Sequence, residues 1–331
     1  MLSSRTRKRQ ESPVVESGRR YVELLDPAEE ELDVRRGWLI DPFQTHRGNC
    51  GVTRARSCSA MVPQSSWVMK FGVSVPNVGP PAALIELGVA AECAGWDGFF
   101  LWDHLHLIRA MALDVHDPWV LLGALAMRTE HLRLGTLVTP VPRRRPWKLA
   151  KEVITLDHLT NGRAVLGVGL GFPADDEFEA FGEPGDDRVR AGRLDAGLSL
   201  IDSFLRGQPV EHATAHYRVD AAMRPAAVQK PRPPIWVAGT WPNHAPLRRA
   251  ARWDGVVPIR ADNSTFGPEL IESVVAVTGT RPGFDVVAPL WPGVAVAEMA
   301  DAGATWLTTS RWPDGDWFDD LRAEVLDGPP R

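Results

Sequence analysis

From residue 70 onward, short apolar runs alternate with longer amphipathic stretches along the chain. The runs predict eight strands at residues 71–75, 98–101, 132–138, 164–168, 234–238, 255–259, 285–288 and 305–308. The amphipathic stretches predict helices at residues 81–94, 118–128, 146–159, 187–205, 246–252, 268–277, 294–302 and 316–325. Several helices begin at a proline, and the first ends before Gly95, as is typical of helix starts and caps. This α/β alternation predicts a closed (β/α)8 TIM barrel with insertions, with a doubly wound open sheet as the alternative.

Two segments depart from the alternation. Residues 1–68 mix arginine and glutamate blocks without a sustained period, so we expect a mostly disordered N-terminal extension. An equally open interpretation is a gene-model extension, with translation starting at Met61 or Met69. The barrel domain would then cover residues 69–331. Residues 208–224 look like an insertion, in which residues 217–219 are expected to form a strand of a small hairpin over the barrel mouth.

The composition is that of an ordinary globular protein, with 44% hydrophobic and 24% charged residues and a net charge of −5. This charge predicts no nucleic-acid partner, and no apolar run approaches the roughly 20 residues of a membrane span. Cys50, Cys58 and Cys93 lack framework spacing, which argues against a disulfide scaffold and favours a reducing cytosol. We therefore expect a cytoplasmic protein without membrane contact. Thirteen tryptophans predict that several fill the core or line a pocket.

Active sites of such barrels lie at the carboxyl ends of the strands. Asp103 and His104 follow the second strand, where a histidine beside an aspartate is an acid/base group, a metal ligand, or a solvated histidine beside a capping aspartate. A metal site needs further ligands at later strand ends. Those ends supply no histidine or carboxylate, so no metal is predicted and a metal-dependent hydrolase is the weakest interpretation.

The other strand ends carry weaker signals. Residues 135–140 offer backbone amides and hydroxyls to a flat polar ring, or simply end a buried strand. The glycines of 167–171 allow close approach of a planar ligand, and residues 238–242 expose amides that suit a phosphate, unless they form a plain loop. We interpret the arginines of 143–145 as an anion site or a solvated loop, and the acidic run 175–177 as a solvated helix start.

Six segments in order, at residues 69–76, 94–104, 134–140, 161–171, 231–239 and 251–255, together resemble the luciferase-like superfamily of flavin- and deazaflavin-dependent oxidoreductases. The resemblance implies a (β/α)8 barrel that binds FMN or coenzyme F420 with the ring in its mouth. It implies that His104 is the active-site histidine, with Asp103 beside it.

The resemblance also implies a set of cofactor-binding residues. A bulged strand, often with a non-proline cis peptide, would back the ring, followed by a second strand end and a phosphate loop. These places hold Thr136, Leu137 and Val138, then Gly169 and Gly171, then Ala238, Gly239 and Thr240. Sugar-phosphate dehydrogenases of the family carry a threonine and a glutamate where this chain has Leu170 and Phe172. That departure, with Trp102 nearby, argues for a hydrophobic substrate instead.

The sequence thus predicts an oxidoreductase or monooxygenase that acts on a small molecule with reduced FMN or F420. Either the cofactor transfers hydride, with His104 donating or accepting the substrate proton, or it activates O2. A flavin or F420 reductase is a possible partner, and a homodimer is a possible assembly. The alternative from another class is a non-catalytic cofactor-binding barrel, either an accessory subunit or a degenerate paralogue.

Overall fold

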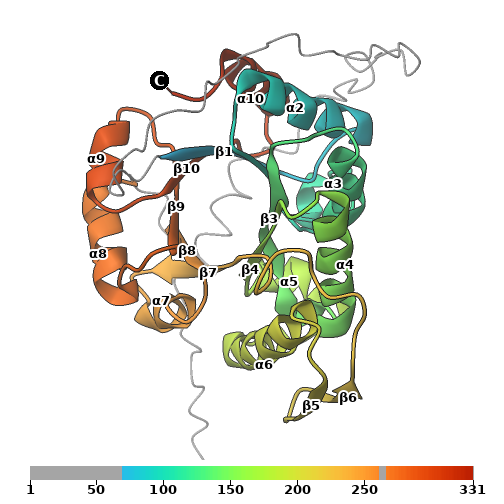
Figure 1. Ribbon diagram of the computed structural model, residues 1–331. Coiled ribbons are helices and arrows are strands. Elements are labelled where there is room, and N and C mark those ends of the chain that lie inside the picture. Colours follow the sequence, from blue (N-terminus) through green and yellow to red (C-terminus); the bar gives the residue numbers. More distant parts are fainter. Residues whose placement is uncertain (1–68, 261–265, 331) are drawn as a thin grey trace, which may run out of the picture. The chain divides into compact units, whose positions relative to one another are not determined.

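The computed structural model describes residues 69–260 and 266–330, and in this part of the chain eight parallel strands close into a barrel (Figure 1). The barrel strands follow chain order, and β1 pairs with both β2 and β10. They are β1 (Lys70–Val75), β2 (Gly98–Leu101), β3 (Arg133–Pro140), β4 (Ala164–Gly169), β7 (Ile235–Trp241), β8 (Gly255–Arg260), β9 (Asp285–Pro289) and β10 (Trp306–Thr309). This closure confirms the predicted TIM barrel and excludes the open sheet, because an open sheet would leave two edge strands unpaired.

Helices connect successive strands and surround the barrel (Figure 1). They are α2 (Pro81–Ala94), α3 (Pro118–Ala126), α4 (Pro146–Leu159), α5 (Ala174–Glu177), α6 (Asp187–Leu205), α7 (His244–Ala250), α8 (Pro268–Thr278), α9 (Val296–Asp301) and α10 (Trp317–Asp327), with short 3-10 turns η1 (Arg109–Met111), η2 (Val141–Arg143) and η3 (Glu179–Phe181). The bounds of α2, α4 and α6 match the sequence prediction. Helix α7 starts two residues before the predicted Pro246, because the Asn243 side chain caps it by accepting a hydrogen bond from Ala245 N.

The barrel interior is packed with side chains. A buried cluster inside it comprises Phe100, Val165, Trp236, Val257, Val287 and Trp306. The three aromatic rings of this cluster lie with their centroids 5.4 to 5.8 Å apart, in tilted or edge-on contacts. Trp236 and Trp306 therefore fill the core, as the tryptophan count predicted. This packing closes the barrel axis, and in such barrels the ligand site lies at the carboxyl ends of the strands.

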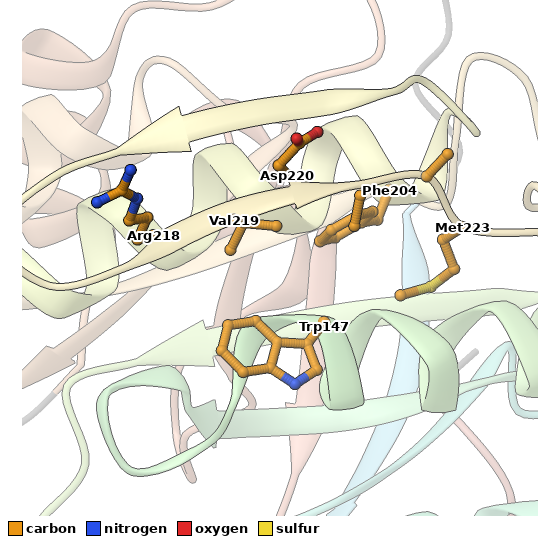
Figure 2. Close-up of a pocket in the computed structure, with 8 residues that line it drawn as sticks. Trp147, Phe204, Arg218, Val219, Asp220 and Met223 are labelled. Atoms are coloured by element: carbon orange, nitrogen blue, oxygen red, sulfur yellow. The ribbon is translucent and has the colours of Figure 1, made fainter.

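The insertion does form a hairpin, but not over the mouth. Strands β5 (Val210–Ala213) and β6 (Arg218–Ala221) pair antiparallel and lie beyond α6, away from the ring of strands (Figure 1). Figure 2 shows Trp147 of α4 on one side of a surface hollow of about 380 Å³, with Val219 and Met223 on the other. None of the residues that line this hollow belongs to a barrel strand. The predicted position was wrong because the hairpin packs beside α6, where Val210 is buried, and not at the carboxyl ends of the barrel strands (Figure 1).

Two further expectations concern other parts of the chain. The interpretation of residues 1–68 lies outside the described ranges, as do Cys50 and Cys58. Cys93 lies on α2, within the described part of the chain. No helix within residues 69–260 or 266–330 is long and apolar enough to cross a membrane.

Candidate active site

The alternation of side chains along each strand determines which residues face the barrel mouth. Successive strand residues face opposite sides, so positions two after the interior residues Phe100, Trp236 and Val257 face inward again. These positions hold Trp102, Ala238 and Ile259. Ala238 is half-buried on the interior cluster, and Ile259 is 42% exposed. The floor of the mouth is therefore mostly apolar and partly open to solvent.

Strand β3 carries an irregularity at the mouth, as the family resemblance implied. Its pairing with β4 shifts between Thr136 and Thr139, and the Leu137–Val138 peptide is cis. A Cβ at Gly167 would lie 2.2 Å from the Thr136 carbonyl oxygen, so only glycine fits beside the irregularity. The irregularity breaks the alternation along β3. It leaves Leu137 and Val138 half-buried on the interior cluster.

Three predicted cofactor residues from three strands lie side by side. A Cβ at Gly169 would lie 2.9 Å from Val138 Cγ2 and 3.4 Å from Ala238 Cβ. Gly169 therefore lets the three strand ends lie in close contact, because a side chain there would have to displace Val138. The half-buried apolar surface of Val138 and Ala238 beside it is of a kind that suits a flat ring.

Other predicted cofactor residues shape the backbone around this place. Thr136 is fully buried and its hydroxyl donates to Gly167 O over 3.1 Å. Gly171 has φ +87°, and a Cβ there would meet Phe178 and Pro140 at 2.7 Å. A Cβ at Gly239 would meet Leu247 of α7, whereas Thr240 is exposed and continues the mouth-facing alternation of β7. Only backbone groups of Thr136, Gly171 and Gly239 remain for a cofactor.

The predicted catalytic Asp103 is engaged elsewhere. Its carboxylate is buried and accepts hydrogen bonds from Thr139 Oγ1 at 2.8 Å, Arg143 Nη2 at 2.9 Å and Arg144 Nη2 at 2.8 Å. Among the hydrogen bonds of the described ranges, none joins Asp103 to the His104 ring. Asp103 therefore anchors the chain after β3. The prediction of a solvated loop or an anion site at Arg143 and Arg144 was wrong, because both are drawn inward by this carboxylate.

His104 is held at the rim by its backbone. Asn77 Nδ2 donates to His104 O over 2.9 Å, and His104 N donates to Asn77 Oδ1 over 3.3 Å. The imidazole lies edge-on to Trp102 with centroids 5.9 Å apart. Its Nδ1 is buried and lies 3.5 Å from Glu177 Oε1, without meeting the geometry of a hydrogen bond. The side chain is 19% exposed, so part of the ring is accessible.

Glu177 was missed by the sequence prediction. It was interpreted as part of a solvated helix start, yet its carboxylate is fully buried. Glu177 Oε1 accepts from the backbone amides of His106 at 2.9 Å and Leu107 at 2.7 Å, and Arg143 Nη1 lies 2.5 Å from Oε2. A carboxylate thus ties the loop after β2 to the segment after β4.

We expect Glu177 to make the stability of the barrel pH-dependent. Burial alone would raise the pKa of this carboxylate, but the His104 ring, the Arg143 guanidinium and the His106 amide outweigh it and lower the pKa to about 2. Because the folded pKa lies below the ordinary value of 4.5, the carboxylate stabilises the fold above that pH, and this contribution is lost as the pH falls toward 2. The shift corresponds to about 3 kcal/mol at neutral pH.

Urea unfolding of Glu177→Gln and wild type measures this contribution. The free energy of unfolding should differ by about 3 kcal/mol at pH 7 and by less than about half of that at pH 3. Asp175→Asn, at an exposed position two residues earlier, should leave stability unchanged at both pH values. A difference for Glu177→Gln that is the same at both pH values would contradict the assignment.

The structure offers no metal site in the described part of the chain. No group of three or more histidine, cysteine, aspartate or glutamate side chains there is arranged to hold a metal ion. The mouth instead combines an apolar floor, glycine-lined strand ends and one histidine backed by a buried carboxylate.

The chain belongs to the luciferase-like monooxygenase family, whose model matches residues 69–298. An F420-dependent glucose-6-phosphate dehydrogenase of Nakamurella multipartita is 35% identical over 198 residues, covering 56% of this chain and 54% of that protein. A phthiodiolone/phenolphthiodiolone dimycocerosates ketoreductase of Mycobacterium kansasii is 29% identical, covering 59% of this chain and 58% of that protein. The chain spans somewhat more than half the length of these curated relatives.

Solved structures support the same fold. The coenzyme F420-dependent tetrahydromethanopterin reductase of Methanopyrus kandleri matches with a TM-score of 0.64 and 16% identity, over 78% of this chain and 98% of that chain. A monooxygenase of Streptomyces bottropensis matches with a TM-score of 0.56 and 27% identity, over 67% of this chain and 70% of that chain. At 16% identity, the similarity to the reductase supports the fold alone.

Proposed function

We propose that this protein is an F420-dependent oxidoreductase that interconverts an alcohol and a carbonyl group on an apolar small molecule. The observation that carries the proposal is His104 at the rim of an apolar mouth, with a buried carboxylate behind its ring. Reduction of a carbonyl needs a proton for the oxygen, and oxidation of an alcohol needs a base for the same proton. A histidine at this place serves both directions.

The residues of the mouth fit a deazaflavin ring. Val138 and Ala238 provide half-buried apolar surface, and Gly169 keeps the space between them free of a side chain. When bound there, F420 would supply hydride transfer. The exposed residue Thr240 and the amides near it are the groups that would meet the polar tail.

The chain's own contribution is the handling of the substrate proton. His104 Nδ1 faces Glu177, so Nε2 is the ring nitrogen left to donate a proton to the substrate oxygen or accept one from it. Trp102 lies against the imidazole, and its Nε1 donates to Ser74 Oγ over 3.0 Å, which fixes the indole beside the histidine. This arrangement orients the acid/base group and covers one side of it with an apolar surface.

Two observations favour an apolar substrate. Phe172 is 56% exposed directly after β4, at the place where the resemblance expects the glutamate of sugar-phosphate dehydrogenases. Trp102 and Ile259 face the mouth from two other strands. An exposed apolar surface at a ligand site binds apolar groups. The relatives include both an F420-dependent glucose-6-phosphate dehydrogenase and a phthiodiolone/phenolphthiodiolone dimycocerosates ketoreductase, and this lining favours a substrate of the second kind.

Fluorescence and absorbance titrations of the purified protein with F420 and with FMN test the cofactor directly. We expect saturable binding of F420, and turnover with a panel of secondary alcohols and ketones of increasing apolar length. FMN binding without F420 binding would instead support a monooxygenase, like the Streptomyces bottropensis enzyme of the solved structure. If the folded barrel binds neither cofactor, the proposal fails, and the result favours a non-catalytic barrel instead.

A filled mouth should prevent cofactor binding. We expect Ala238→Phe to weaken F420 binding by at least about tenfold, because the phenyl ring would cover the half-buried apolar surface proposed for the cofactor ring. Ala245→Phe makes the same substitution at an exposed position on α7 and should bind normally. Titration of both variants checks this, with circular dichroism to verify folding. Unchanged binding by Ala238→Phe would place the cofactor elsewhere.

A further inference from the structure

The loop that carries His104 is attached to the segment after β4 by two neighbouring carboxylates. Glu177 accepts hydrogen bonds from the amides of Leu105, His106 and Leu107. Asp176 binds Arg109, whose amide and Nε donate over 3.1 and 3.2 Å. Both acids therefore hold the loop, but only Glu177 contacts the imidazole. Glu177 can therefore act on the imidazole as well as on the backbone of the loop.

The two oxygens of Glu177 have different neighbours. Oε2 pairs with Arg143 Nη1 at 2.5 Å, and Oε1 faces the amides of the loop and His104 Nδ1. The Arg143 guanidinium also binds Asp103, so turning away from Glu177 would break an ion pair with a second buried acid as well. The carboxylate is thereby fixed in one orientation and kept ionised.

A buried imidazole nitrogen that faces an anionic oxygen must carry the proton. If Nδ1 were unprotonated, its lone pair would face the negative charge of Glu177 without a donor between them. In the neutral ring, a proton on Nδ1 leaves the lone pair on Nε2. The other ring nitrogen is then ready to accept a proton, and the cation formed afterwards lies against a negative charge.

We propose that Glu177 is the positioning residue of His104: it selects the Nδ1–H tautomer and directs Nε2 into the barrel mouth. Its catalytic consequence rests on the proposed function, whereas the tautomer itself does not. Glu177 acts through His104 and does not touch the substrate. During alcohol oxidation Nε2 accepts the hydroxyl proton, and the hydride from the same carbon would go to F420, the acceptor in the proposed function. During carbonyl reduction the hydride would come from reduced F420 and Nε2 returns the proton to the oxygen, while Nδ1 keeps its own proton throughout.

Nitrogen-15 NMR of the imidazole in the full-length protein tests the tautomer. Spectra are recorded at a pH where the histidine rings are neutral, and His104 is assigned by comparison with His104→Phe. The wild type should show a proton on Nδ1. Glu177→Gln should lose this preference, and the matched variant Asp176→Asn should keep it. A wild-type ring protonated on Nε2 would overturn the proposal, and so would an unchanged tautomer in Glu177→Gln.

The tautomer of the wild type decides the question even if Glu177→Gln does not fold. If the variant folds, steady-state kinetics with saturating F420 add a second readout, in which kcat should fall at least about tenfold while F420 affinity stays within about twofold. A purely structural role would lower thermal stability but leave kcat of the folded enzyme unchanged, and that result would overturn the catalytic part. Failure of the wild type to bind F420 would instead count against the proposed function, and the NMR result would still stand.

Discussion

Replacing Arg143 with methionine is expected to lower the free energy of unfolding by about 3 to 5 kcal/mol. The Arg143 side chain is only 5% exposed and pairs with two buried acids, Asp103 and Glu177. Burial lowers the pKa of its guanidinium, while the same two carboxylates act to raise it. Methionine fills a similar volume but leaves both negative charges without their shared partner, and that desolvated charge is the source of the loss.

Urea unfolding followed by tryptophan fluorescence gives the measurement, and Arg145→Met provides the control. Arg145 lies two residues further on and is exposed, so the same substitution there should change stability by no more than about 0.5 kcal/mol. A similar loss of unfolding free energy in both variants would mean that the loss comes from altering the loop itself. The buried pairs would then contribute little.

Replacing His104 with phenylalanine is expected to lower kcat about 10² to 10⁴-fold, the range for loss of a general acid/base. Phenylalanine keeps the ring against Trp102 but removes both nitrogens. Binding of F420 should change little, because the surface of Val138 and Ala238 that we propose for the ring belongs to other strands. The rate of F420 reduction or reoxidation by a turnover substrate, together with a cofactor titration, separates these two effects.

The control is His106→Phe, two residues away in the same loop. The His106 ring stacks on Phe181 with centroids 5.0 Å apart, on a different partner from His104. This variant should retain turnover within a few fold. Equal loss in both variants would indicate that the loop had moved, and normal turnover in His104→Phe would remove the histidine from the chemistry.

The barrel was predictable because its signals are local. Buried parallel strands are continuous apolar runs, and Pro81 and Gly95 mark the two ends of α2 through their own backbone preferences. The carboxyl ends of strands were harder to predict. β7 continues past its apolar run to Trp241, because pairing with β8 up to Arg260 extends it, and that pairing is not visible in either segment alone.

The candidate site was only partly predictable. Alternation along β2 and β7 places Trp102 and Ala238 at the mouth, but the irregularity in β3 breaks that rule, so Val138 came only from the family resemblance. Glu177 carried no signal, since Asp175, Asp176 and Glu177 are chemically alike and only the last turns inward. Its partners lie about 70 residues earlier in the chain, where sequence spacing gives no information.

The carboxylate shared between the loop after β2 and the segment after β4 joins two strands that are not neighbours in the barrel. The segment after β4 also carries Phe172, one of the apolar residues exposed at the rim. An insertion or deletion there would therefore alter which molecules enter and, at the same time, displace the imidazole on the opposite side of β3. Exchanging substrate preference with a relative would require both segments to be transplanted as a pair.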